Sequence, residues 1–160
     1  MKKLVLILSL IVFFGCKSKK TVLETEEKTT EIKIEKLALT EVDAGLKNKA
    51  YELGKRVLMT CNTSKFKPFT QSEATNSVIT NMTLEKLSKT CNRYRQFYGD
   101  FKDIQLTEIY KDYENNSTIF RYKALYTKKV ANKELRVFMN NENKVSAIKS
   151  MDWVDTFQNK

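Results

Sequence analysis

The chain has 160 residues, with 29 lysines and arginines against 19 aspartates and glutamates, no histidine and three cysteines. This length fits one small domain. Its formal net charge is +10, but two lysines precede the first apolar run and three follow the first cysteine, so the excess elsewhere is thin. Because the sequence also lacks a nucleic-acid-binding motif, we expect no nucleic acid partner. The lack of histidine removes the commonest general base.

The first fifteen residues have the pattern of an export signal. Lys2 and Lys3 precede an uninterrupted run of apolar or small residues at positions 4–14. This run is too short to span a bilayer, which needs about 20 apolar residues. Residues 1–15 are therefore predicted to be a signal peptide.

Gly15 and Cys16 follow this run in the stretch "VFFGCKSKK", which resembles the lipobox of bacterial lipoproteins. The resemblance implies thioether lipidation of Cys16, cleavage before it and acylation of the new amino terminus. Phe13 stands where the family usually has leucine, and the alternative is a plain secretory signal with an incidental cysteine. The lipoprotein interpretation places the protein in a bacterial cell envelope. Acylated Cys16 would anchor it in a lipid bilayer, the outer membrane being favoured, with the domain in the periplasm or at the cell surface.

Residues 16–41 are dense in lysine, glutamate and threonine and contain no aromatic residue. They offer little apolar surface to offset the entropy of ordering, so we predict a flexible charged tether. The three lysines just after Cys16 either lie against anionic head groups or are solvated linker charges. Ile32, Ile34 and Leu37 leave open a short edge strand or a docking segment in the later part of the tether.

Helical periodicity begins at residue 42. Apolar residues recur every three or four positions from there to residue 61, which predicts one long helix. Asp43 suits the positive end of the dipole of this helix. Pro68 breaks the pattern because proline cannot donate a backbone hydrogen bond. A short, weak second helix is expected within residues 71–82.

A third helix is predicted between Thr83 and Gly99. Thr83 can cap its amino end, apolar and aromatic side chains recur at spacings of three or four, and Gly99 suits the left-handed conformation that closes a helix. The residues that follow are rich in β-branched and aromatic types and predict four strands, at about 104–113, 118–128, 133–140 and 144–153. Short connections make these strands an antiparallel meander, with the helices packed on one face in an α+β fold.

This order of elements resembles the cystatin-like cone of the nuclear-transport-factor-2-like superfamily. The segment "MTLEKLSKTCNRYRQFYGDFKDI" is similar to the helix and the Gly-x-Phe step into the first sheet strand of secreted members, and "ELRVFMNNENKVSAI" looks like their hairpin. The resemblance implies a cystatin-like α+β domain at residues 42–157, in which a curved four-stranded sheet wraps around helices. It also implies a cavity at the open end, which members use for small ligands or for dimerisation.

Cys61 and Cys91 remain as an even pair once Cys16 is lipidated. In an oxidising compartment they can form a disulfide, and both lie on the inward stripes of the predicted helices. The alternative is two buried, reduced cysteines that behave as small apolar residues. With no histidine and no Cys-x-x-Cys spacing, we expect no metal site and predict no cofactor.

Aromatic side chains are the candidates for a pocket. The candidate set is Tyr94, Tyr98, Phe120, Tyr122, Tyr126 and Trp153. An aromatic stripe on a strand more often belongs to a core, although tyrosine hydroxyls commonly reach a cavity or an interface. The favoured function is a non-catalytic module that binds a small apolar ligand or an envelope protein.

Two other functions stay open. In one, a tyrosine and an aspartate of the cavity form an enzyme site, and the residues available for it are Tyr94, Tyr98, Asp100, Asp103, Asp112 and Asp152. No spacing pairs a particular carboxylate with a particular tyrosine, so no catalytic residue is predicted. In the other, the domain is a structural envelope component that uses its sheet to form a homodimer.

Overall fold

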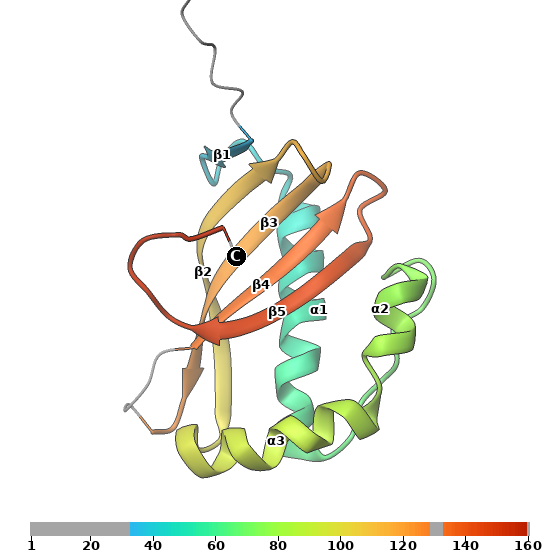
Figure 1. Ribbon diagram of the computed structural model, residues 1–160, viewed down its shortest axis with the longest axis vertical. Helices are drawn as coiled ribbons and strands as arrows, with labels where there is room; N and C mark the ends of the chain where they lie inside the picture. The colour runs from blue at the N-terminus through green and yellow to red at the C-terminus, as the bar shows by residue number, and fades with distance from the viewer. Residues whose placement is uncertain (1–32, 129–132, 160) are drawn as a thin grey trace, which may run out of the picture. The chain divides into compact units, whose positions relative to one another are not determined.

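The protein is built on one sheet of five antiparallel strands. The computed structural model describes residues 33–128 and 133–159, in which the strands follow the order β1-β2-β3-β4-β5 across the sheet (Figure 1). They are β1 (Ile34–Leu37), β2 (Phe101–Asp112), β3 (Ser117–Tyr126), β4 (Lys133–Asn140) and β5 (Val145–Asp152). Asn116 and Asn143 adopt left-handed conformations in two of the connecting turns, which asparagine tolerates better than most residues. The predicted α+β class, with helices on an antiparallel meander, is confirmed.

The structure has one strand more than the four predicted in the second half of the chain: β1 forms where the sequence left open a short edge strand. Ile34 pairs with Asp112 and Leu37 with Ile109, so β1 extends the sheet along β2. Only the two terminal residues of this four-residue strand are partly buried, and the two between them are exposed and charged. Backbone pairing to β2 therefore defines β1 more than side-chain burial does. For this reason the segment reads in sequence like the charged tether around it.

Three helices lie in the first half of the domain: α1 (Ala44–Thr63), α2 (Asn76–Asn81) and α3 (Leu84–Tyr98). The side chain of Asp43 accepts a hydrogen bond from the backbone of Leu46 at the start of α1. Thr83 caps α3 in the same way, and Gly99 ends it with a φ of 77°. These local signals are the ones that the sequence predicted.

The hydrophobic core lies between α1 and one face of the sheet. Figure 1 shows α1 behind the sheet and α3 crossing near the end of α1. The buried residues of α1 include Leu53 and Val57, which belong to the same core cluster as Phe120 and Tyr122 of β3. At Gly54 an added Cβ atom would come within 2.8 Å of the Val137 side chain on β4. The absence of a side chain there lets α1 approach the sheet closely.

The opposite face of the sheet is crossed by the C-terminal residues. After β5 ends at Asp152, residues 153–159 run back across this face (Figure 1), and we call them the C-terminal strap. Beneath the strap, Arg121, Glu134 and Arg136 are at most 1 % exposed. The predicted last strand included Trp153. Instead, Trp153 is the first residue of the strap.

Candidate functional site

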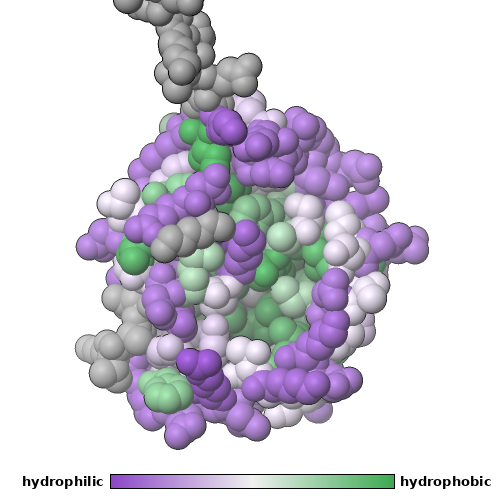
Figure 2. Space-filling view, viewed as in Figure 1, coloured by the Kyte–Doolittle hydropathy of each residue, from purple (hydrophilic) through white to green (hydrophobic). Residues whose placement is uncertain are grey.

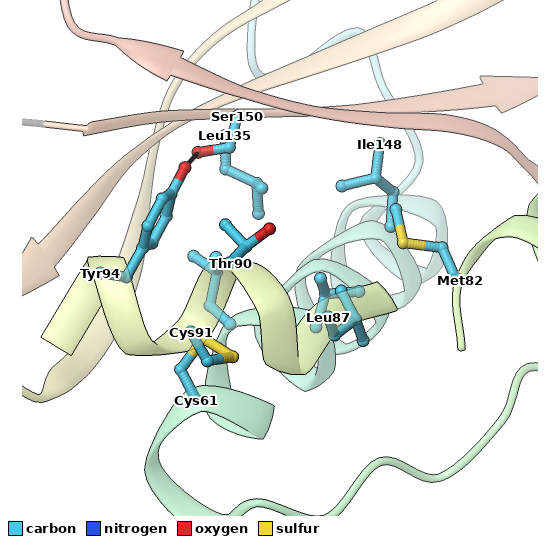
Figure 3. A pocket seen from close by; sticks show the side chains of 11 residues that line it. Cys61, Met82, Leu87, Thr90, Cys91, Tyr94, Leu135, Ile148 and Ser150 are labelled. Carbon is cyan, nitrogen blue, oxygen red and sulfur yellow. Dashed lines mark hydrogen bonds between the residues drawn. A yellow bond between two sulfur atoms is a disulfide. The ribbon is translucent and has the colours of Figure 1, made fainter. Parts of the chain in front are cut away.

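An apolar cavity lies between α3, the end of α1 and the β5 edge of the sheet. Its volume is about 120 Å³. Figure 2 shows the corresponding hollow in the surface, with apolar side chains gathered between β5 and α3. In the close view of Figure 3, side chains of α3 point up towards the strands and side chains of β4 and β5 point down to meet them. The main apolar lining residues are Val57, Leu58, Met82, Leu87, Leu135 and Ile148.

A disulfide joins the two helices that border the cavity. The structure bonds Cys61 near the end of α1 to Cys91 in the middle of α3, and both cysteines are buried and line the cavity. Cys91 is the only residue of α3 that is fully buried. The disulfide attaches α3 to α1, and the apolar side chains on either side of Cys91, Leu87 and Tyr94, pack against the core while remaining only partly buried.

The polar groups at the cavity are few and neutral. The Tyr94 hydroxyl donates a hydrogen bond to Ser150 Oγ at 3.0 Å, which links α3 to β5 across one end of the cavity (Figure 3). Among the described residues, Thr90 is the only other polar residue of the lining, and none of the lining residues is charged. Since burying a charge in such a site is costly, the cavity suits a neutral apolar group.

Of the six predicted pocket residues, only Tyr94 lines this cavity. Tyr98 packs edge-on against Tyr94, with ring centroids 5.4 Å apart, and also contacts Tyr126 at 5.5 Å. Tyr126 is buried in the core cluster. Tyr94, Tyr98 and Tyr126 thus form one aromatic cluster, of which Tyr94 reaches the cavity.

The remaining predicted pocket residues lie elsewhere. Phe120 and Tyr122 are fully buried in the core, because their side chains point to the sheet face that α1 covers. Burial also raises the pKa of Tyr122, and its hydroxyl has no hydrogen-bond partner among the described residues. Trp153 lies on the opposite face of the sheet, with its ring 4.1 Å from the guanidinium of Arg121.

The sequence did not single out the cavity residues Met82, Leu87, Ile148 and Ser150. Leu87 belongs to the apolar stripe of α3, which predicts only that this helix face turns inward. Whether an inward face is filled or hollow depends on how α3 crosses the sheet. That geometry is set by contacts between distant segments and has no local signal in the sequence.

The carboxylates considered for an enzyme site are engaged in other contacts. Asp103 accepts a hydrogen bond from the Tyr51 hydroxyl at 2.7 Å and pairs with Lys55 at 3.1 Å, away from the cavity. Partial burial acts to raise the pKa of Asp103, but the hydrogen bonds from Tyr51, the Ile104 backbone and Lys55 outweigh it and lower the pKa. A lowered pKa makes this carboxylate a weaker base.

Two of the other three candidate aspartates, Asp112 and Asp152, are similarly occupied. Asp152 is paired with Lys133 at 2.6 Å, and hydrogen bonding to this lysine lowers the pKa of Asp152. Asp112 accepts hydrogen bonds from the backbone and side chain of Asn115 in the turn after β2. None of these contacts therefore joins Tyr94 or Tyr98, the two candidate tyrosines of α3, to a carboxylate.

A second, wider cleft of about 580 Å³ lies between the strands β1 and β2 and the C-terminal strap. Glu108 and Tyr110 line it together with Phe157. Burial, followed by the hydrogen bond with Glu108, raises the pKa of Tyr110 to about 12. For Glu108, burial acts to raise the pKa, but hydrogen bonds from Lys36 and Arg121 outweigh it and lower the pKa. This pair is therefore poorly suited to proton transfer near neutral pH.

Within residues 33–128 and 133–159, no three histidine, cysteine, aspartate or glutamate side chains are grouped so that they could hold a metal ion. In the same part of the chain, no helix has both the length and the apolar character needed to cross a bilayer. The predicted lipidation site, Cys16, lies outside the described residues.

Comparisons of this chain with protein-family models, with curated proteins and with solved structures find no match.

Proposed function

We propose that the protein is a lipoprotein of the bacterial cell envelope whose α+β domain is a non-catalytic binding module. The observation that carries the proposal is the apolar cavity between α1, α3 and β5. Its lining carries no charge, and its polar groups are confined to Thr90, Ser150 and Tyr94. Such a site favours the transfer of an apolar group out of water.

The size of the cavity limits the ligand. Pockets that enclose a drug-sized molecule measure roughly 300–1,000 Å³, whereas this cavity measures about 120 Å³. An engineered cavity of about 150 Å³ lined by aliphatic and aromatic side chains binds benzene. The group bound here therefore has about the size of one leucine, methionine or phenylalanine side chain. A partner protein of the envelope or a small apolar ligand could present such a group.

The order of elements supports the cystatin-like cone as the finer fold. A long helix, a short helix and a helix that ends at Gly99 precede an antiparallel meander, as in the resemblance described above. Two features depart from the four-stranded cone: β1 adds a strand beside β2, and the C-terminal strap crosses the outer face. In this proposal, the cavity beside α3 takes the role of the ligand site that the resemblance implies.

Binding of a small apolar group can be tested with benzene as the probe. We expect benzene to shift the backbone amide resonances of cavity residues, including Leu87 and Ile148, in a saturable way. Leu87→Trp should fill the cavity and abolish these shifts. Leu84→Trp is the matched control, because Leu84 is one turn earlier on α3, is 41 % exposed and does not line the cavity. If benzene causes no saturable shifts in the wild-type protein, the cavity is not a binding site and the proposal fails.

The membrane anchor needs a separate experiment. Because the stretch ending in Gly15-Cys16 resembles a lipobox, we expect the mature protein to enter the detergent phase on temperature-induced phase separation. Cys16→Ala should leave the protein unprocessed, or soluble in the aqueous phase. Cys16→Ser distinguishes loss of lipidation from a size effect at this position. Recovery of the wild-type protein without lipid in the aqueous phase would contradict the lipoprotein part of the proposal.

A further inference from the structure

The sheet face opposite the helices carries a group of buried charges. Arg121 on β3 and Arg136 on β4 are register partners and point to this face, as does Glu134, two residues before Arg136. The Glu134 carboxylate accepts hydrogen bonds from both guanidinium groups, including one from Arg121 Nη2 at 2.7 Å. Glu108 on β2 adds a second ion pair to Arg121. The three central residues are at most 1 % exposed.

The C-terminal strap covers these charges. Arg121 donates a hydrogen bond to the Val154 carbonyl, and Arg136 donates one to the Gln158 carbonyl at 2.6 Å. The Trp153 ring lies over Arg121. The strap forms no strand of the sheet, so these contacts resemble the docking of a peptide on a surface more than an extension of the fold.

Phe157 is the second aromatic anchor of the strap. Its ring lies 4.3 Å from the Arg136 guanidinium and stacks on Tyr110 at a centroid distance of 3.9 Å. Trp153 and Phe157 are thus spaced four residues apart, each over one arginine. Each cation–π contact of this kind makes only a modest contribution to binding. The hold of the strap therefore depends on a few side-chain and carbonyl contacts.

The charge of this face favours an acidic occupant. On the sheet face that the strap covers, the central positions of the strands carry more cationic than anionic side chains. The cations are Lys36, Arg121, Lys123, Arg136 and Lys149, and the anions are Glu108 and Glu134. The strap itself carries Asp155 between its two aromatic anchors, and the Asp155 carboxylate accepts a hydrogen bond from Trp153 Nε1 at 3.2 Å. The strap sequence "WVDTF" therefore indicates the features of a peptide that would bind this face.

The charged character of the face also bears on whether the strap can leave. A buried arginine–glutamate–arginine cluster is often no more stabilising than apolar side chains of the same volume. An apolar face would be exposed to water each time the strap detached, whereas this face would become hydrated. Charged residues at these positions therefore keep the uncovered state accessible.

We propose that the sheet face carrying Arg121, Glu134 and Arg136 is a peptide-binding surface that the C-terminal strap occupies within the chain. The partner is an extended segment of another protein, with two aromatic side chains four residues apart and an acidic residue between them, and it displaces the strap. This surface lies on the side of the sheet away from the cavity, so the inference is independent of the proposed function.

The full-length protein allows a direct test, because Trp153 is the only tryptophan in the chain. The probe is the peptide Phe-Val-Asp-Thr-Phe-Gln-Asn, which contains the strap sequence without tryptophan. As the peptide displaces the strap, the Trp153 emission should shift to the red and its quenching by acrylamide should increase, both saturably. The peptide Ala-Val-Asp-Thr-Ala-Gln-Asn, which lacks both anchors, should cause neither change.

A variant whose strap binds less tightly makes the test more sensitive, because less peptide is needed to displace the strap. A segment tethered within the same chain competes at an effective concentration in the millimolar range, so the wild-type protein should respond only to millimolar peptide. Phe157→Ala removes one anchor, and we expect it to lower the half-saturating peptide concentration at least tenfold. Phe97→Ala is the control, because Phe97 on α3 is exposed and far in sequence from the strap.

Two results would overturn the proposal. If neither the wild-type protein nor Phe157→Ala responds to the peptide at several millimolar, the strap is a fixed part of the fold. If the Trp153 emission instead depends on protein concentration without peptide, and a dimer forms, the occupant is the strap of a second copy. The titration of the wild-type protein decides whether the strap can be displaced even if Phe157→Ala fails to fold. Neither result affects the test of benzene binding to the cavity.

Discussion

Arg121 and Arg136 face each other directly on neighbouring strands, and both are almost completely buried. Like charges opposed across a sheet are destabilising, so this pair requires a counterion between its members. Glu134 provides it, with one carboxylate oxygen towards each arginine. Glu134 is therefore the carboxylate shared by both arginines, while Glu108 pairs with Arg121 alone.

Glu134→Gln should be strongly destabilising. Removing one partner of a buried ion pair leaves an uncompensated charge, which costs about 3–5 kcal/mol. We expect a loss of this size in the free energy of unfolding, measured by urea denaturation with Trp153 fluorescence and far-ultraviolet circular dichroism. Glu142→Gln is the control, since Glu142 forms an exposed pair with Lys144, and such pairs are worth less than about 1 kcal/mol. Equal losses for the two variants would contradict a structural role for Glu134.

The hydroxyl groups of Tyr122 and Tyr94 should affect stability with opposite signs. The Tyr122 hydroxyl is buried without a partner among the described residues, so Tyr122→Phe removes a desolvated group and should raise the free energy of unfolding by about 1 kcal/mol. Tyr94→Phe removes the hydrogen bond to Ser150 and should lower it by about 1 kcal/mol. Thermal and urea unfolding of both variants would check this. A loss of stability in Tyr122→Phe would show that its hydroxyl has a partner in solution.

Truncation at Tyr122 tests its assignment to the core. The side chain is fully buried under α1, so Tyr122→Ala should cost about 3–5 kcal/mol, the amount typical of an aromatic residue in a tight core. Leu84→Ala, at an exposed position of α3, should cost much less. A loss below about 2 kcal/mol for Tyr122→Ala would mean that the ring borders open space, as the pocket hypothesis from the sequence supposed.

Elements with a local chemical signature could be predicted from the sequence. The Thr83 cap and a helix end at Gly99 each depend on one or two neighbouring residues, and both appear in the structure, although Gly99 has a positive φ of 77° with a ψ of −154° instead of the left-handed helical conformation. The alternation on β3 likewise predicted that Phe120 and Tyr122 share a face. It did not predict whether that face is filled or hollow.

The features that escaped prediction depend on contacts between distant segments. The sequence left β1 open as a short edge strand without predicting it, because two of its four residues are charged and it forms by pairing with the edge of β2. Alternation placed Arg121 and Arg136 away from the core, where arginine is normally exposed. Their burial comes from the strap, whose residues follow β5 without a turn signal. Trp153 was for this reason assigned to the wrong side of the sheet.

The Cys61–Cys91 disulfide should be essential to α3. It closes a loop of 30 residues, and restricting the unfolded chain to this extent is worth about 3–4 kcal/mol. The double variant Cys61→Ala/Cys91→Ala should lose about this amount and should no longer bind benzene, because Cys91 is the buried attachment point of α3. The single variant Cys16→Ala controls for cysteine loss elsewhere. Two thiols titratable in denatured Cys16→Ala protein purified without reductant would contradict this prediction.

Glu73 should make stability depend on pH in the acid range. Its carboxylate accepts two hydrogen bonds from Arg56, at 2.7 and 3.0 Å, and one from the backbone of Thr70. Hydrogen bonding to Arg56 is the largest influence and, against the opposing effect of burial, lowers the pKa of Glu73 from 4.5 to about 2. The ion pair ties the segment before α2 to α1, next to the backbone bridge between Ala74 and Val145.

The sign of the effect follows from this lowered pKa. A carboxylate with a lower pKa in the folded state stabilises the protein fully above pH 4.5, and the contribution is lost as the pH falls towards 2. At about 1.4 kcal/mol for each pKa unit, it amounts to at most about 3 kcal/mol. Glu73→Gln should therefore be less stable than the wild type at pH 7, and the two unfolding free energies should converge near pH 2. Glu52→Gln, at an exposed position of α1, should follow the wild type throughout. A stability difference between Glu73→Gln and the wild type that stays constant from pH 7 to pH 2 would show that the Glu73 carboxylate is not the titrating group.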